Sequence, residues 1–320
     1  MTYREAVSDA LWQEMERDER VFIMGEEVGV WGGTYAVTRG FYDHFGEKRV
    51  RDTPIAELAI VGAAVGAAMN GLRPVAEIMT INFALYAFDA IINHAAKVRY
   101  MFGGQFRVPL VIRTTTGGGR QLGATHSHSP EAIFAHFPGL YVAVPSTPYD
   151  AKGMLIEAIR NDNPVLFVEH STLYQTRGEV PVAPYTVPLG KSAVAREGSD
   201  VTIVSYSKMV QISLQAADML AKEGVSAEVI DLRSLRPLDL GPVIESFKKT
   251  NRCVVVEEGH PRFSVASEVA ATLQDEAFDW MDAPVKRVNQ EDVPLPYARE
   301  LEQMALPNPQ KVVAAVREIL

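Results

Sequence analysis

The 320-residue sequence predicts an α/β protein built from two doubly wound domains. Helical periodicity and short β-rich runs alternate along almost the whole chain, which is typical of parallel sheets covered by helices on both faces. A hydrophobic content of 47% supplies enough apolar side chains for a core in each domain. Between about Gly178 and Gly190 the alternation lapses into an extended stretch with three prolines, which predicts a linker.

The first domain is expected to span residues 1–180, the linker residues 181–195 and the second domain residues 196–320. Apolar residues at helical spacing predict first-domain helices at 3–18, 56–71, 84–102 and 148–161. Short β-rich runs predict its strands at Val21–Met24, Val75–Ile81, Pro109–Thr115, Val142–Val144 and Val165–Glu169. In the second domain, strands are predicted at Val201–Ser205, Ala227–Asp231, Cys253–Glu257 and Val285–Val288, with helices at 209–223, 240–250, 263–278 and 309–320.

Charge and terminal features narrow the class of protein. The net charge of -9 comes from mixed acids and bases without a basic cluster, so neither nucleic acid nor an anionic membrane is expected as a partner. Thr2 and Glu5 have capping-box spacing, so we expect a helix at the start with no targeting peptide before it. Cys253 begins an apolar run and is expected in the core, which leaves no disulfide or thiolate zinc site. A cytoplasmic location follows as an expectation.

Glu57 stands at the start of a helix of apolar and small residues, within the segment Asp52–Met69. An acid in the first turn of a helix often only complements the helix dipole. Alternatively, a carboxyl group shielded from water by apolar neighbours can exchange a proton with a ligand. The residues alone leave both interpretations open.

A glycine-rich loop over residues 117–130 carries His126 and His128 just before a predicted helix. Loops after strand ends hold the functional sites of doubly wound folds. As surface or capping residues, these histidines would have no chemical role. Their spacing also permits a metal, but no third ligand lies nearby in the sequence, so a zinc site has little support.

Phosphate-binding motifs are absent from the sequence. It has no Gly-Lys-Ser/Thr loop, no dinucleotide-type glycine fingerprint after the first strand, and no Gly-Asp-Gly followed by a distant Asn. A phosphorylated cofactor would therefore need another chain to hold its phosphates.

Several segments together resemble, in order and spacing, the beta subunit of thiamine-diphosphate-dependent 2-oxo acid dehydrogenases of the pyruvate dehydrogenase type. In the first half these are Met24–Val28, Asp52–Glu57, Val65–Met69, Gly103–Gln105 and Gly123–Ser127. In the second half they are Glu228–Asp239, Val255–Gly259 and Asp292–Ala298. The resemblance covers essentially the whole chain, and the beta subunits of branched-chain and acetoin dehydrogenases are close relatives.

The resemblance implies a pyrimidine-binding domain followed by a transketolase C-terminal-like domain. It implies an alpha2beta2 heterotetramer whose alpha chain carries the missing motif and holds magnesium and most of the diphosphate. The implied reaction is oxidative decarboxylation of a 2-oxo acid, first of all pyruvate, with transfer of the acyl group to the lipoyl group of an acyltransferase core.

The resemblance also implies residue roles at the cofactor. Glu57 would hydrogen-bond the pyrimidine ring of thiamine diphosphate, and Glu26 matches a second acid near that ring. Phe83 matches the aromatic residue that packs on the ring, and Tyr86 would lie one turn further on. Without the resemblance, the aromatic stretch Ile81–Tyr86 would be placed in the core.

On the substrate side, His126 matches a histidine that would donate a proton to the dithiolane sulfur and orient the intermediate, with His128 secondary. Asp292 lies in a segment resembling the region that docks the basic subunit-binding domain of the acyltransferase. A solvated turn is the alternative for Asp292.

Some relatives hold a structural potassium ion with backbone carbonyls. The matching positions here are Leu110, Ala158, Ile159 and Asn161, with Asn163 beside them. Because Asn161 stands where relatives have Asp, this site would carry one negative charge fewer.

Three alternatives accompany the main prediction. Branched-chain 2-oxo acids or acetoin are possible substrates, because the substrate pocket would be shared with the alpha chain. Transketolase-type transfer is disfavoured, because such enzymes carry the diphosphate motif in the same polypeptide. A catalytically silent scaffold subunit would not need Glu57, Phe83 and His126.

Overall fold

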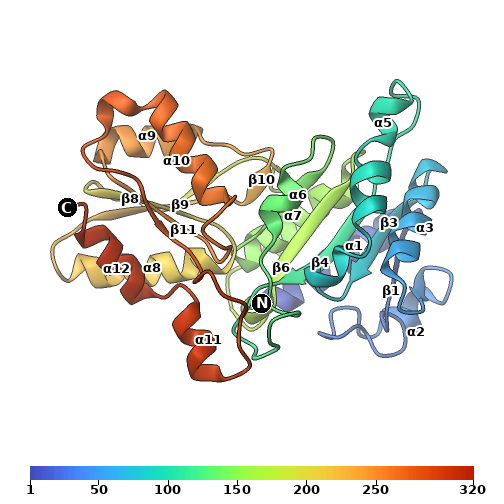
Figure 1. Ribbon diagram of the computed structural model, residues 1–320. Helices are drawn as coiled ribbons and strands as arrows, with labels where there is room; N and C mark the ends of the chain where they lie inside the picture. The colour runs from blue at the N-terminus through green and yellow to red at the C-terminus, as the bar shows by residue number, and fades with distance from the viewer. The chain divides into compact units, whose positions relative to one another are not determined.

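In the computed structural model, which describes residues 1–320, the chain divides into two compact units (Figure 1). The first comprises Met1–Thr116 and Ile133–Leu189, and the second comprises Gly117–Ala132 and Gly190–Leu320. The expected bounds of 1–180 and 196–320 stay predictions. One feature differs from those bounds: residues 117–132, which lie within the first domain in sequence, pack with the second unit.

Six strands of the first unit form a parallel sheet in the order β5-β6-β4-β3-β1-β2. Their bounds are β1 Val21–Gly25, β2 Val50–Asp52, β3 Arg73–Ile78, β4 Val111–Thr116, β5 Tyr141–Ala143 and β6 Val165–His170. The central strands are buried along their whole length, as expected for a parallel sheet covered on both faces.

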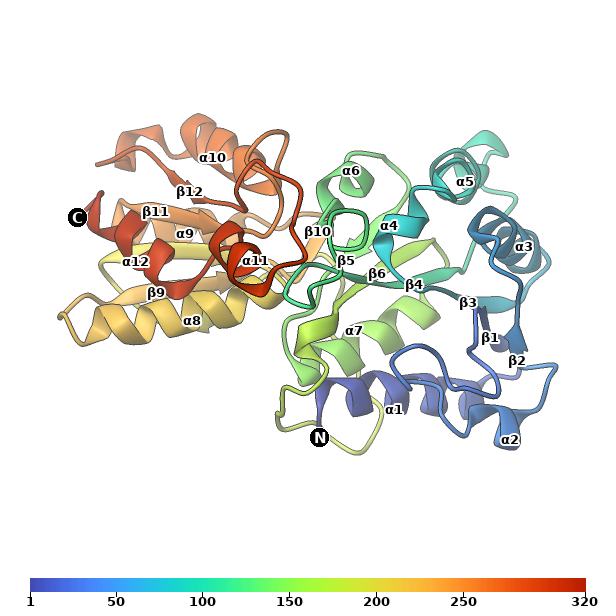
Figure 2. The ribbon, with the colours of Figure 1, turned by 60° about the horizontal axis from the view of Figure 1, so that its bottom comes forward.

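Helices cover both faces of this sheet (Figure 2). α1 (Tyr3–Arg17) and α7 (Pro148–Arg160) pack together on one face, and α3 (Glu57–Met69) lies on the other. The shorter elements are α2 Phe41–Phe45, α4 Ile81–Ala84, η1 Ala90–Ala95, α5 Val98–Met101, α6 Glu131–Ala135 and η2 Ser171–Leu173. The predicted capping box is confirmed, because the Thr2 hydroxyl accepts from the Glu5 amide and the Glu5 carboxylate accepts from the Thr2 amide.

The single helix predicted at 84–102 was wrong. The structure divides this stretch into α4, the π-helix η1 and α5. The helix widens where the Ala96 amide bonds to the carbonyl of Ile91, five residues back. Asn93 and His94, which are weak helix formers, both bond to Asp89 through their side chains there.

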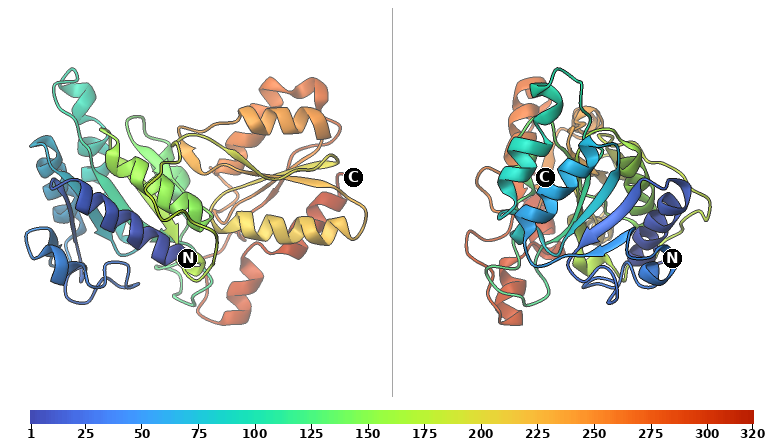
Figure 3. Two further views of the ribbon diagram at one scale, coloured as in Figure 1. Left: turned by 180° about the vertical axis from the view of Figure 1, so that it is seen from behind. Right: turned by 90° about the vertical axis from the view of Figure 1, so that its right-hand side faces the viewer.

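The second unit contains a smaller sheet in the order β12-β11-β8-β9-β7, parallel except for β7. Its strands are β7 Ala193–Arg196, β8 Val201–Ser205, β9 Ala227–Asp231, β11 Cys253–Val256 and β12 Lys286–Val288, and β10 Ser234–Arg236 follows β9. The left view of Figure 3 shows α8 (Lys208–Ala221) and α12 (Pro309–Arg317) on one face, with α9 (Gly241–Thr250) and α10 (Val265–Glu276) on the other. η3 (Phe278–Trp280) and α11 (Arg299–Ala305) complete the unit. Two doubly wound α/β domains are thereby confirmed.

Cys253 is buried in β11, as expected, and burial raises the pKa of its thiol. The apolar core around β11 includes Val201, Val229 and Leu220. None of the helices combines the length and the apolar sequence that a bilayer crossing requires.

Candidate functional site

In the first unit, acidic residues gather where the chain order of the sheet reverses. β1 lies between β2 and β3, and the chain runs from β1 to β2 and then returns through α3 to β3. Ligands of doubly wound folds bind at the carboxyl ends of strands beside such a reversal. Glu26 follows β1 directly, and Glu57 begins the helix that leads back to β3.

Glu57 lies on the buried stripe of α3. The residues at helical spacing from it, Ile60, Val61 and Ala64, are buried, and Glu57 is itself only 7% exposed. Glu57 also lies in the first turn of α3, where a carboxylate complements the helix dipole. The helix therefore holds this carboxyl group among apolar side chains at the carboxyl edge of the sheet.

Glu26 is equally buried, and its Oε1 has no hydrogen-bond partner. Burial raises the pKa of the Glu26 carboxyl group, and the negative charges of Glu57, Glu27 and Glu77 raise it further. Glu26 consequently retains a proton at pH values where an exposed glutamate has lost it. The unpartnered oxygen and the neighbouring Glu57 form a polar pair suited to a ligand with donor and acceptor nitrogens.

A buried charge network that was not predicted from the sequence lies close to this pair. Glu77 on β3, Arg113 on β4 and Glu169 on β6 lie on adjacent strands. The Arg113 guanidinium donates to both carboxylates, with Nε at 2.5 Å from Glu169 Oε1, and the Tyr174 hydroxyl donates to Glu169 Oε2 at 2.8 Å. Although burial lowers the pKa of Arg113, the two carboxylates outweigh it and raise the pKa well above its usual value. An arginine inside an otherwise buried strand was the signal available in the sequence, since it requires buried acidic partners.

The aromatic candidates Phe83 and Tyr86 follow β3. Phe83 lies in the short helix α4 and is partly exposed. Tyr86 lies beyond the end of that helix and is 71% exposed. The contacts of Phe83 and Tyr86 with a pyrimidine ring stay predictions.

The histidines lie in the second unit, within the segment 117–132. His126 is exposed, and its Nδ1 lies 2.8 Å from the Thr125 hydroxyl, while its amide bonds to the carbonyl of Gly123. His128 is half-buried, and burial lowers its pKa, with a further contribution from the charge of His260. The two side chains therefore differ in access to solvent, and their roles stay predictions.

Comparisons with known proteins cover the whole chain. The family described as transketolase, pyrimidine binding domain, matches residues 1–177, and the transketolase C-terminal domain matches residues 190–312. The chain is 48% identical over 319 residues to the pyruvate dehydrogenase E1 component subunit beta of Rickettsia felis, covering 100% of this chain and 98% of the relative. The chain belongs to the E1 beta-subunit family of 2-oxo acid dehydrogenases.

The names of other similar proteins contain other substrates. The 2-oxoisovalerate dehydrogenase subunit beta of Bacillus subtilis is 47% identical over 321 residues, covering 100% of this chain and 98% of the relative. The acetoin:2,6-dichlorophenolindophenol oxidoreductase subunit beta of the same organism is 44% identical over 328 residues, with coverages of 99% and 96%. A solved structure described as a split gene transketolase in an inactive beta4 tetramer gives a TM-score of 0.82 at 27% identity, covering 100% of this chain and 98% of that one.

Membership of the E1 beta-subunit family implies thiamine diphosphate, and the acidic pair of the first unit fits its pyrimidine ring. The ring offers an amino donor and ring nitrogens, and Glu26 Oε1 is a buried acceptor without a donor. Glu57 supplies a second carboxyl group at the same edge. No group of three or more histidine, cysteine, aspartate or glutamate side chains is placed to hold a metal ion.

The carbonyls expected at a potassium site already have partners. Arg73 Nη1 donates to the carbonyls of Ile159 and Asn161 at 2.9 and 3.0 Å, and its Nη2 donates to Asp162 at 2.6 Å. The carbonyls of Leu110 and Ala158 accept backbone amides. The Asn161 side-chain oxygen accepts from the amide and the side chain of Asn163. The Arg73 guanidinium thus places its positive charge at two of the four carbonyls, which disfavours a further cation there, and the expected potassium site stays a prediction.

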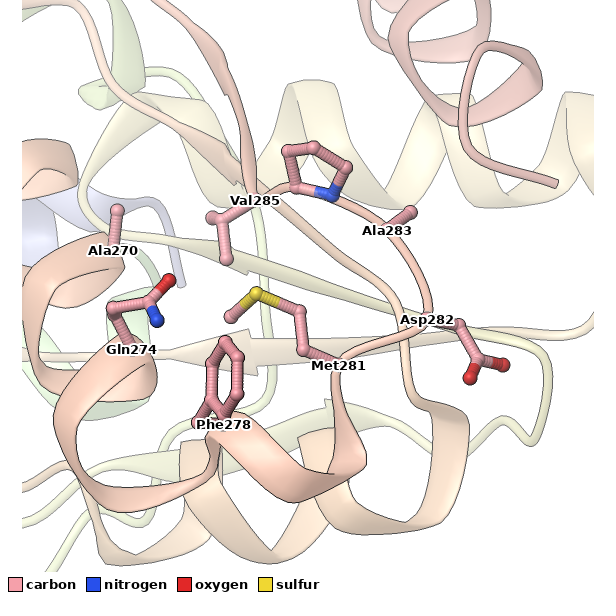
Figure 4. A pocket seen from close by; sticks show the side chains of 8 residues that line it. Ala270, Gln274, Phe278, Met281, Asp282, Ala283 and Val285 are labelled. Carbon is pink, nitrogen blue, oxygen red and sulfur yellow. The ribbon is translucent and has the colours of Figure 1, made fainter.

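Asp292 is 57% exposed and lies 3.7 Å from Arg262 and 4.0 Å from His260. Its docking role stays a prediction. A hollow of about 420 Å³ elsewhere in the second unit has no catalytic groups (Figure 4). Met281 and Phe278 face its interior, whereas the Asp282 carboxylate points away from it.

Proposed function

We propose that this E1 beta subunit oxidises pyruvate, together with an alpha chain in an alpha2beta2 heterotetramer. The observation that carries the proposal is the buried pair formed by Glu57 and the unpartnered Glu26 carboxyl group at the reversal of the first sheet. The named relative from Rickettsia felis supports pyruvate as the substrate. The acetoin and 2-oxoisovalerate relatives keep those substrates as alternatives.

When bound, thiamine diphosphate supplies the carbon that attacks the 2-oxo acid. Glu57 would hydrogen-bond the pyrimidine nitrogen and share a proton with it, because its apolar surround would strengthen this hydrogen bond. Glu26 carries a proton at neutral pH more readily than an exposed acid and stabilises the same ring. Phe83 would cover the ring face and exclude water, and Tyr86 would lie beyond it at the edge of the site.

His126 acts on the lipoyl group in this proposal. The Thr125 hydroxyl at Nδ1 fixes the orientation of the imidazole ring. Its exposure admits a long, flexible lipoyl arm, whose dithiolane sulfur takes a proton from the imidazole as the acyl group is transferred. His128, which is half-buried, has a secondary role.

The proposed function requires two partners, an alpha chain and a lipoyl acyltransferase core. The alpha chain supplies the diphosphate motif and holds magnesium, because this chain has no Gly-Asp-Gly motif. A basic domain of a lipoyl acyltransferase core docks near Asp292. Arg73 supplies positive charge at the carbonyls of Ile159 and Asn161, which disfavours potassium at that place. The cytoplasmic location stays a prediction from the sequence.

The test is a reconstituted heterotetramer with Glu57→Gln in this chain. We expect a fall in kcat of at least roughly 100-fold, since proton transfer by a positioned group typically contributes that much. Glu47→Gln, at an exposed acid of the same unit, should leave activity unchanged.

The outcomes separate the alternatives. Normal activity of Glu57→Gln would exclude the proposed mechanism, whereas loss of activity with intact assembly would exclude a purely structural subunit. Wild-type rates on pyruvate, 2-oxoisovalerate and acetoin decide the substrate.

A further inference from the structure

Glu302 in α11 is a fully buried carboxylate that the proposed reaction does not use. It forms no ion pair. Its oxygens instead accept from the Gly119 amide at 2.9 Å, the Gln121 amide at 3.1 Å and the Gln121 side chain at 2.7 Å. Burying a carboxylate is costly unless hydrogen bonds compensate, so these bonds to the loop are what allow Glu302 to be buried.

A second carboxylate holds the same loop. The Gly118 amide donates to Glu258, which lies just beyond the end of β11 and is also buried. Successive backbone donors of the glycine-rich loop thus point at carboxylates on two other segments of the second unit. Such charge-assisted bonds are about twice as strong as neutral ones.

The loop backbone has a conformation that needs this support. Gln121 has φ +54°, in the left-handed region that a residue with a side chain seldom adopts. Gly123 has φ +78°, and a Cβ there would lie 2.4 Å from the Tyr297 ring. A Cβ on Gly118 would lie 2.6 Å from Leu295. The loop is therefore pressed against the segment that carries Glu302.

We propose that Glu302 is a positioning residue for His126, because it fixes the loop that delivers this histidine. Few residues separate Glu302 from His126 along the hydrogen bonds. Glu302 accepts a hydrogen bond from the Gln121 side chain, and two residues later the Gly123 carbonyl accepts a hydrogen bond from the His126 amide at 3.3 Å. At the base of the loop, the Gly117 amide bonds to the carbonyl of His128 at 3.2 Å. The inference rests on the proposed role of His126 in acyl transfer to the lipoyl group.

Release of the loop would lower the fraction of molecules with His126 in place. Fixing the backbone of a residue costs conformational entropy, so several freed residues sample many other conformations. The apparent rate of a step that needs one conformation falls with the population of that conformation. Decarboxylation of the 2-oxo acid, which would use Glu57 and Glu26 of the other unit, precedes electron transfer to either acceptor and does not need His126 in the proposed function.

The experiment compares two rates in the reconstituted heterotetramer, one with a lipoyl domain and one with the dye 2,6-dichlorophenolindophenol as electron acceptor. In Glu302→Ala we expect the lipoyl rate to fall about tenfold more than the dye rate, as the competent population falls. Glu302→Gln should lie between, because its amide oxygen still accepts from the Gly119 and Gln121 amides. Glu300→Ala, at an exposed acid of the same helix, is the control.

Equal falls of both rates in Glu302→Ala would overturn the positioning role. His126→Ala is the reference variant. If it leaves the ratio of the lipoyl rate to the dye rate unchanged, the proposed role of His126 is wrong, independently of the results for Glu302. Hydrogen exchange independently tests whether Glu302 fixes the loop, because amides of residues 117–123 should exchange faster in Glu302→Ala than in Glu300→Ala. Unchanged exchange would show that Glu302 does not fix the loop. If Glu302→Ala fails to assemble, Glu302→Gln and Gln121→Ala undergo the same comparison.

Discussion

The buried position of Glu26 predicts that the stability of the folded chain depends on pH. Its folded pKa is raised by burial and by nearby negative charges. The stability that Glu26 contributes is therefore present below its unfolded pKa and lost as pH rises through the folded pKa. Glu26→Gln removes this titration, so the stability of the variant relative to wild type should increase from pH 4 to pH 8. Urea unfolding of the purified chain at both pH values checks this, with Glu47→Gln as control. An advantage that does not grow with pH would contradict the prediction.

Single residues were predictable where a motif or a helical stripe marked them. Glu57 could be placed because its neighbours along α3 are apolar, and the structure puts it on the buried stripe. Glu77 and Glu169 could not be paired with Arg113, because the strand order β6-β4-β3 joins segments that lie far apart in the sequence. Glu302 was missed for the same reason, since its partners lie about 180 residues earlier.

At the scale of elements, long periodic segments were predictable and local irregularities were not. α1, α3, α7 and α8 lie close to their expected bounds, because each is a long segment without an internal break. The interruption of residues 84–102 coincides with side-chain hydrogen bonds of Asp89 to Asn93 and His94, which periodicity does not report. The short elements β7, β10 and α11 were missed, since a few residues carry too little pattern.

The turn after α7 gives a prediction about ions. The last carbonyls of a helix lack intrahelical partners and attract positive charge, and here Arg73 provides it. We expect the melting temperature of the wild-type chain to be the same in potassium and sodium chloride. Arg73→Gln should lower the free energy of unfolding by about 2 kcal/mol, since it removes charge-assisted hydrogen bonds.

Arg107→Gln is the matched control for Arg73→Gln. Arg107 bonds to the same Asp162, but its side chain is 66% exposed, so its loss should cost about 0.5 kcal/mol. Thermal and urea unfolding in both salts measure these differences. A saturable rise in the wild-type melting temperature that is specific to potassium would show that the ion binds in spite of Arg73.

At the scale of the whole molecule, the proposed function assigns this chain one part of a cofactor site. Its carboxyl pair suits a pyrimidine ring, whereas the sequence has no motif for a diphosphate and the structure has no cluster for a metal ion. The two α/β domains were predictable from the alternation of helices and strands. The packing of residues 117–132 with the second unit was not, because it depends on the distant carboxylates Glu258 and Glu302.

The division of the cofactor site between chains predicts the outcome of a calorimetric titration with thiamine diphosphate and magnesium. The assembly of this chain with its alpha chain should bind at least roughly 100-fold more tightly than the chain alone, about 2.7 kcal/mol, because only the assembly holds the diphosphate. Glu57→Gln in the assembly should weaken binding less than removal of the alpha chain, since it removes only one contact to the ring. Tight binding by the isolated chain would mean that this chain holds the diphosphate itself, and the alpha chain would then have to contribute something other than the phosphate site.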